Sequence, residues 1–133
     1  MKTLYLASAM LVDEANRLLT VRKKGSSYYM MPGGKIEAGE TAVAALLREL
    51  REELGLCLGP EDVEFLGVHE AVAVNEASTN VQGNVFLVVL PAAMAIHAQA
   101  EIEELCWLTK ENYQQYKLAH LLTEFTLPRW LLR

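Results

Sequence analysis

Three glutamates near the middle of the chain have a spacing that suits the binding of a metal ion. Glu49, Glu52 and Glu53 stand at positions i, i+3 and i+4, so a helix would bring their side chains together. Ionised carboxylates this close repel one another, and a hard divalent cation such as Mg²⁺ or Mn²⁺, which prefers oxygen ligands, removes that repulsion. The alternative is a solvated acidic helix face that pairs with Arg48 and Arg51.

The segment around these glutamates predicts a helix. From Glu40 to Leu54 there is neither proline nor glycine, and good helix formers dominate. Gly55 suits the left-handed residue that ends a helix, and Pro32-Gly33-Gly34 lets the preceding backbone turn tightly and approach a ligand. The larger apolar residues recur at helical spacing, as in a helix buried along one face. They are Val43, Leu46, Leu47, Leu50 and Leu54.

Residues 34–56 also fit a longer pattern at every specified position. They read G-x5-E-x7-R-E-U-x-E-E-x-G-U, where U is aliphatic. A pattern with this many fixed positions is far more specific than a lone glycine motif. In these residues the chain resembles the Nudix hydrolases, which include the MutT-like proteins. The resemblance implies cleavage of a diphosphate bond and an α/β/α sandwich with a mixed β-sheet and a loop-helix-loop motif.

The resemblance assigns roles to the residues of this box. It implies that Glu52 and Glu53 bind the catalytic Mg²⁺ or Mn²⁺. It implies that Glu49 orients or deprotonates the attacking water and contributes to the metal site. Arg48 would hold Glu49 by a charge-assisted hydrogen bond.

Further site residues are expected outside the central glutamates. The resemblance implies that the Gly33 carbonyl is another metal ligand and that Glu40 is a weaker one. Relatives often use one more glutamate, located before a late strand that carries a tryptophan. Glu101 is the first choice for this catalytic role and Glu104 the second, because both precede Trp107. For each of them, a solvated acid beside a strand is the alternative.

Four residues are expected to contact the substrate. Tyr28 and Tyr29 lie where relatives often place an aromatic ring against a nucleobase, and stacking suits any base. Packing under the sheet is an equally good interpretation for one of the two. Asn75 belongs to a polar loop whose amides could read a base edge, and Lys35 follows the glycine pair within the box.

The coarse pattern of the chain alternates strands and helices, which predicts the same sandwich between helices. Expected strands are 3–12 and 17–24, joined as a hairpin, then 28–31, 63–74, 81–90 and 105–108. Expected helices are 40–54, 110–116 and 118–125.

Composition narrows the classes of protein. The chain has 133 residues, 52% of them hydrophobic, and we expect one domain over 1–133 with a real core. The net charge of −5 and the lack of a basic cluster argue against binding a nucleic-acid polymer. No apolar run is long enough to cross a membrane. Cys57 and Cys106 form no motif, which favours reduced thiols in the cytoplasm. A monomer or a homodimer is expected.

Several functions are compatible with the resemblance. Hydrolysis of a nucleoside triphosphate or related nucleotide, including oxidised deoxynucleotides, is the leading hypothesis. Hydrolysis of ADP-ribose or another nucleoside diphosphate-X compound is the alternative. Isoprenyl diphosphate isomerases and nucleotide-sensing modules are less favoured, because the isomerases lack an intact box and the sensors typically lose its carboxylates.

Overall fold

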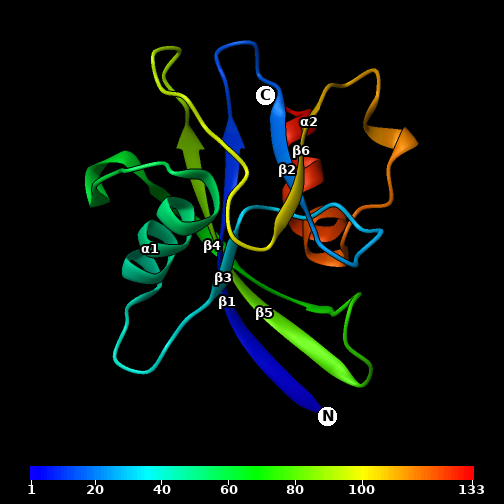
Figure 1. Ribbon diagram of the computed structural model, residues 1–133. Coiled ribbons are helices and arrows are strands. Elements are labelled where there is room, and N and C mark those ends of the chain that lie inside the picture. Colours follow the sequence, from blue (N-terminus) through cyan, green and yellow to red (C-terminus); the bar gives the residue numbers. More distant parts are fainter.

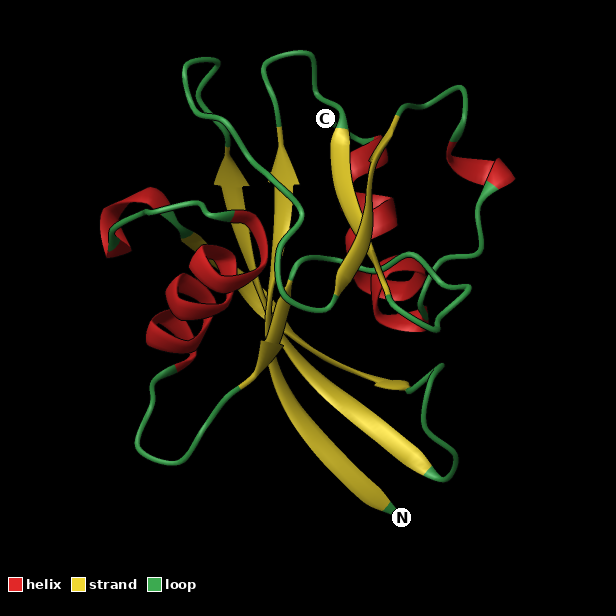
Figure 2. Cartoon of the chain, in the orientation of Figure 1, coloured by secondary structure: helices red, strands yellow, loops and turns green.

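The computed structural model describes residues 1–133 and contains one mixed sheet (Figures 1 and 2). Its strands are β1 (Lys2–Val12), β2 (Leu18–Lys23), β3 (Gly33–Lys35), β4 (Glu64–Val72), β5 (Thr79–Val89) and β6 (Ile102–Leu108). The sheet order is β4-β5-β1-β2-β6, and the short β3 pairs with β1. β1 and β5 run parallel over their whole length, whereas the other pairs are antiparallel. β1 therefore lies at the centre of the sheet and contacts three other strands.

Helical segments cover both faces of this sheet. α1 (Ala42–Leu54) packs on one face, and the C-terminal segment of η3 (Leu122–Thr126) and α2 (Leu127–Leu131) packs on the other. Two short 3-10 turns, η1 (Pro60–Asp62) and η2 (Tyr113–Gln115), lie in the connections. This arrangement confirms the predicted α/β/α sandwich. No helix is long and apolar enough to cross a membrane.

Alternation along β1 divides the core into two halves. Ala7, Ala9 and Leu11 face α1, while Met10 and Val12 face the C-terminal helical segment. Because successive residues of a strand point to opposite faces, one central strand supplies both halves. From Ala7 to Val12 both faces of β1 are buried, which explains why this part of its sequence is almost continuously apolar.

α1 follows the predicted apolar stripe. Leu46, Leu50 and Leu54 are fully buried against the sheet. The helix begins two residues later than predicted, because the Thr41 side chain accepts a hydrogen bond from the Ala44 N–H and caps the first turn. It ends as predicted at Gly55, which has φ of 66°.

The predicted strand over 28–31 is wrong. Tyr29 and Met30 make only isolated bridges, and the true strand is β3, just after Pro32. Gly33 sits so tightly on β1 that a Cβ atom there would collide with the Ala7 carbonyl oxygen, and its φ of +143° also favours glycine. Because only glycine allows the backbone to come this close to β1, the strand pairing forms at Gly33 and Gly34 and not at residues 28–31.

The predicted helices after β6 also need correction. The helix expected over 110–116 shrinks to η2, because Asn112 and Thr109 exchange side-chain hydrogen bonds with each other's backbone and close a tight turn. The helix expected over 118–125 begins at His120 and continues to Leu131, with a π-helical turn in its middle. Trp130, which is fully buried, stabilises this longer segment.

We expect Leu50→Ala to destabilise the protein by about 2–5 kcal/mol, because it leaves a cavity under α1. Urea unfolding measures the change. Leu132→Ala is the matched control: Leu132 is 89% exposed, and its truncation should change the free energy of unfolding by less than about 0.5 kcal/mol. Equal effects at the two positions would contradict the assignment of Leu50 to the core.

Candidate active site

Arg48 holds most of the box carboxylates in one cluster. Its Nε and Nη2 donate to the two oxygens of Glu40 at 2.7 and 2.9 Å, and Nη1 donates to Glu49 Oε1 at 2.8 Å. Weaker bonds of 3.3 and 3.4 Å reach Glu52, and Nη2 also donates to the Lys35 carbonyl at 3.1 Å. The guanidinium therefore joins the loop before α1 to the helix itself.

These contacts have opposite effects on the two partners. The hydrogen bonds from Arg48, helped by the backbone N–H of Glu37, lower the pKa of Glu40 to about 2. The same bonds, first those to Glu40 and then those to Glu49, raise the pKa of Arg48. Both groups stay charged at every ordinary pH, so Arg48 acts as a permanent positive anchor in the site.

Glu53 lies in a different environment. Its side chain is buried under β3, and it accepts a hydrogen bond from the Gly33 N–H at 3.1 Å. Burial raises its pKa to about 7, the carboxylates of Glu49 and Glu101 add to this rise, and the Gly33 N–H and Lys23 oppose it. A carboxylate that is buried, close to other acids and without a full ion pair favours a cation beside it.

Glu49 lies against the second glycine of the turn. A Cβ atom at Gly34 would collide with the Glu49 carboxylate. Arg48 contacts only Oε1 of this carboxylate, which leaves Oε2 available to water or metal. The absence of a side chain at Gly34 therefore makes room for the group that sequence analysis assigns to water activation.

The box residues do not converge as a ready-made metal cluster. No three acidic, histidine or cysteine side chains gather at metal-binding separation, because Arg48 draws Glu40, Glu49 and Glu52 toward itself while Glu53 turns under β3. The donor set still fits a hard divalent cation, since it offers carboxylate oxygens around one buried acid. Glu52 is the easiest to redirect, because its contacts with Arg48 are long and its side chain is half exposed.

The two glutamates expected near β6 have different surroundings. Glu101 lies at the end of a loop that is tied to α1, since the Gln99 N–H donates to the Glu53 carbonyl at 2.9 Å. Glu101 also contributes to the raised pKa of Glu53, which places its charge near the buried acid. Glu104 instead accepts from the Tyr29 hydroxyl at 2.9 Å and from Arg22 Nε at 3.2 Å. The structure thus brings Glu101, but not Glu104, toward the box.

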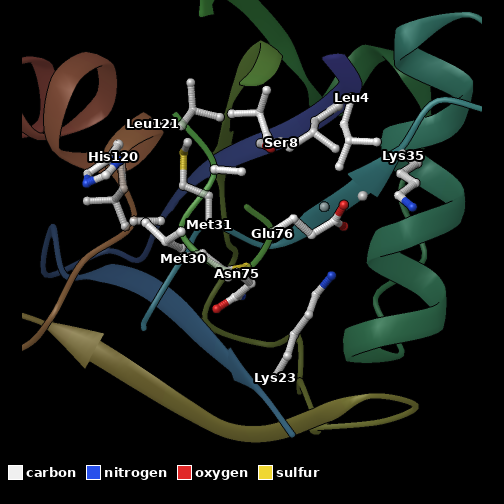
Figure 3. Close-up of a pocket in the computed structure, with 18 of the residues that line it drawn as sticks. Leu4, Ser8, Lys23, Met30, Met31, Lys35, Asn75, Glu76, His120 and Leu121 are labelled. Atoms are coloured by element: carbon white, nitrogen blue, oxygen red, sulfur yellow. The ribbon is translucent and has the colours of Figure 1, made fainter. Parts of the chain in front are cut away.

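A cleft opens beside the glycine turn, with a volume of about 170 Å³ (Figure 3). The backbones of Gly33 and Gly34 form one end of it. Apolar side chains form most of its wall, including Leu4, Leu6, Met30, Met31, Val81 and Leu121. Polar side chains lie around them, namely Ser8, Lys23, Lys35, Asn75, Glu76 and His120. An apolar cleft with a few polar groups, next to a perturbed carboxylate, is the usual form of a small-molecule site.

Lys35 and Asn75 line this cleft, as expected for substrate-binding residues, but the two tyrosines do not. Tyr28 packs with Lys117, whose Nζ lies 4.9 Å from the ring centroid. Tyr29 packs edge-on against Tyr116 and donates to Glu104. This placement does not support a stacking platform, because both rings are engaged elsewhere and no phenylalanine, tyrosine or tryptophan lines the cleft.

Besides Ser8 on β1, sequence analysis assigned no role to three further polar residues of the cleft. Figure 3 shows the Lys23 side chain pointing into the cleft toward Glu76, with Lys35 at the side next to α1. His120 lies at the other side, and its Nδ1 donates to the Val72 carbonyl at 2.8 Å. These residues come from the end of β2, the β4–β5 loop and the C-terminal segment, so only the tertiary fold brings them together.

An α/β/α sandwich that presents a glycine turn and a glutamate-rich helix beside an apolar cleft defines a class of phosphate-handling protein. Comparison with known families identifies it. A family model described as NUDIX domain matches residues 3–127, and the chain belongs to this family.

Individual relatives carry several substrate names. The chain is 45% identical over 58 residues to an RNA pyrophosphohydrolase of Halorhodospira halophila, covering 44% of this chain and 31% of that protein. It is 36% identical over 75 residues to an ADP-ribose pyrophosphatase of Methanocaldococcus jannaschii, covering 51% and 43%. It is 37% identical over 59 residues to an 8-oxo-dGTP diphosphatase of Proteus vulgaris, covering 41% and 53%. The chain spans about a third to a half of the length of these relatives.

Solved structures confirm the fold. The NUDIX domain of Shewanella oneidensis NrtR, crystallised with ADP ribose, superposes with a TM-score of 0.77 over 100% of this chain and 90% of that one. The identity is 19%, so the likeness concerns the fold alone.

The buried acid leads to a prediction about pH and stability. The pKa of Glu53 lies near 7 in the folded protein, above its ordinary value of 4.5, so the folded state holds this proton to higher pH than the unfolded chain. With metal removed by a chelator, the free energy of unfolding should therefore fall as pH rises from about 5 to 7, by on the order of 3 kcal/mol.

Denaturant unfolding across this pH range measures the effect. Glu53→Gln should remove this part of the pH dependence while keeping an acceptor for the Gly33 N–H. Glu103→Gln, at an exposed position on β6, should retain it. Parallel curves for the wild type and Glu53→Gln would show that Glu53 is not a strained buried acid.

Proposed function

We propose that this protein is a Nudix pyrophosphohydrolase that cleaves a diphosphate bond in a nucleotide with the help of Mg²⁺ or Mn²⁺. The observation that carries the proposal is the buried Glu53 carboxylate near Glu49, which accepts from the N–H of Gly33, a residue that lines an apolar cleft together with Lys23 and Lys35. Such a site would offer oxygen ligands for a cation and, in the adjoining cleft, two ammonium groups suited to phosphate. A negatively charged diphosphate requires both the cation and the ammonium groups, because each offsets part of its charge.

The metal would be held by residues of the box. Glu53 and Glu52 would be its main ligands, together with Glu49, and the Gly33 carbonyl and Glu40 are weaker candidates. When bound, the cation neutralises diphosphate charge and lowers the pKa of bound water. Arg48 keeps a positive charge beside Glu49 and Glu52 and thus orients both carboxylates. Lys23 and Lys35 would bind the phosphates that project from the metal.

Proton transfer from the attacking water is assigned to Glu49. One of its oxygens is fixed by Arg48, and the other faces the space above Gly34 that lacks a side chain. A carboxylate held by one oxygen can accept a proton on the other without losing its position. Glu101 is the second candidate for this role because it lies near Glu53. Glu104 is the weaker candidate because Tyr29 and Arg22 occupy it.

The cleft beside the glycine turn would receive the nucleoside. A nucleoside triphosphate or related nucleotide, including an oxidised deoxynucleotide, is the leading substrate, supported by similarity to the 8-oxo-dGTP diphosphatase. ADP-ribose or another nucleoside diphosphate-X compound is the second candidate, supported by similarity to the ADP-ribose pyrophosphatase. Assay of a nucleotide panel with Mg²⁺ and coupled detection of phosphate and pyrophosphate separates the two.

We expect turnover to require a divalent cation and both helix glutamates. Glu52→Gln and Glu53→Gln should each lower kcat/KM by about 100-fold or more, because each removes a charge that holds the metal. Isothermal titration with Mn²⁺ should show weaker binding in both variants. Glu61→Gln, an exposed acid in η1, should retain full activity. Full turnover in excess chelator would refute the metal-dependent mechanism.

The water-activating residue can be identified by separating kcat from KM. Glu49→Gln should lower kcat about 10²- to 10⁴-fold with little change in KM, as expected for an interaction made mainly in the transition state. Glu101→Gln and Glu104→Gln are the matched comparisons. If kcat instead collapses only in Glu101→Gln, the proton acceptor lies on the loop before β6 and the assignment to Glu49 fails.

A further inference from the structure

Two loops meet at the rim of the cleft through one side-chain hydrogen bond. Ser26 lies on the connection between Lys23 and Met30, both of which line the cleft, and Asn75 lies on the β4–β5 loop. Ser26 Oγ and Asn75 Oδ1 are 3.0 Å apart. The serine loop is itself anchored, because Arg22 Nη1 donates to the Ser26 carbonyl at 3.0 Å. Asn75 therefore has a fixed neighbour across the rim.

The direction of this hydrogen bond follows from the atom that faces Ser26: Asn75 Oδ1 is an acceptor, so the serine hydroxyl is the donor. The backbone N–H of Tyr28 donates to Ser26 Oγ at 3.1 Å, and a backbone N–H can only donate. The serine hydroxyl hydrogen is then free to point at Asn75 Oδ1, an acceptor. This bond occupies the amide oxygen. The Asn75 amino group makes no hydrogen bond within the chain and is free to donate to a ligand. At the rim, Asn75 thus presents donors.

We propose that Ser26 and Asn75 together select the base: Ser26 positions the Asn75 amide so that its amino group binds a purine that carries an oxygen at position 6. The proposal rests on the proposed function, which places a nucleoside in this cleft. Guanine and hypoxanthine offer an acceptor at position 6, whereas adenine has an amino group there. If the Asn75 amino group faced the amino group of adenine, two donors would oppose each other and neither would have a hydrogen-bond acceptor.

The rest of the cleft suits this assignment. Its wall is aliphatic and thioether, with Met30 and Met31 on the side where Figure 3 places Asn75. Such a wall contacts the faces of any base and does not distinguish between bases, since methionine adapts to the shape it meets. Discrimination must then come from polar groups at the edge of the ring. Asn75 is the one amide among the residues that line the cleft.

The test compares nucleotides that differ at position 6. Inosine and adenosine triphosphates serve for turnover, and the corresponding monophosphates serve for equilibrium binding by calorimetry, which reports on the base without any hydrolysis. The wild type should prefer inosine over adenosine by about tenfold in kcat/KM and in Kd, the range of one good base contact. Guanosine nucleotides should behave like inosine.

Two variants separate positioning from mere contact. Ser26→Ala frees the amide to turn its oxygen toward the base, so the preference should fall below about threefold, mainly because adenosine improves. Asn75→Asp keeps an acceptor for Ser26 but replaces the amino group by oxygen, so the preference should reverse toward adenosine. Ser27→Ala, an exposed neighbour, is the matched control and should keep the wild-type ratio.

The outcomes distinguish this proposal from the proposed function. Equal binding of inosine and adenosine monophosphates by the wild type would overturn the selection of the base, even if triphosphates are hydrolysed. A tenfold preference that survives in both Ser26→Ala and Asn75→Asp would also overturn it. A preference in binding that the variants change as expected, without any metal-dependent turnover, would support base selection while refuting the hydrolase.

Discussion

The backbone of Gly33 and Gly34 is held between β1 and α1, and the geometry of the site depends on this close contact. A side chain at Gly33 would collide with β1, and one at Gly34 would collide with the Glu49 carboxylate. The Gly33 N–H also donates to Glu53 from the last turn of α1. The glycine backbone therefore packs directly on β1 and is joined to α1 through the Glu49 and Glu53 side chains. The positions of the carboxylates follow from the register of β3 on β1.

The packing of the glycine turn on α1 leaves the glutamates of the site in two opposite electrostatic environments. Around Arg48, the carboxylates are partly exposed and paired with a guanidinium, and the pKa of Glu40 is lowered to about 2. Under β3, burial raises the pKa of Glu53 to about 7. Partly exposed ion pairs contribute little to stability, so the value of the Arg48 cluster is orientation rather than energy. Separation of pKa values between neighbouring acids is a common basis for acid–base chemistry.

Much of the fold could be predicted from the sequence because its signals are local. The apolar stripe and Gly55 predicted α1 and its end, and the strand pattern predicted the sandwich. Partners that depend on tertiary register could not be predicted. Glu104 binds Tyr29 and Arg22 only because β6 aligns with β2 at that position. Lys23 and Glu76 were missed for the same reason, since no local pattern relates the end of β2 to the β4–β5 loop.

The parallel pairing of β1 with β5 has a consequence for how the chain is made. Lys2 pairs with Thr79 and Val12 with Val89, so one edge of the central strand stays unpaired until β5 has been synthesised. Long-range pairings of this kind slow folding, because the entropy of closing the loop is lost before the contacts are gained. Until β5 arrives, this edge of β1 has no hydrogen-bonded partner and is open to association with other chains. The acidic helix is synthesised during this interval, so the glutamates proposed to bind metal exist before the sheet that holds them is complete.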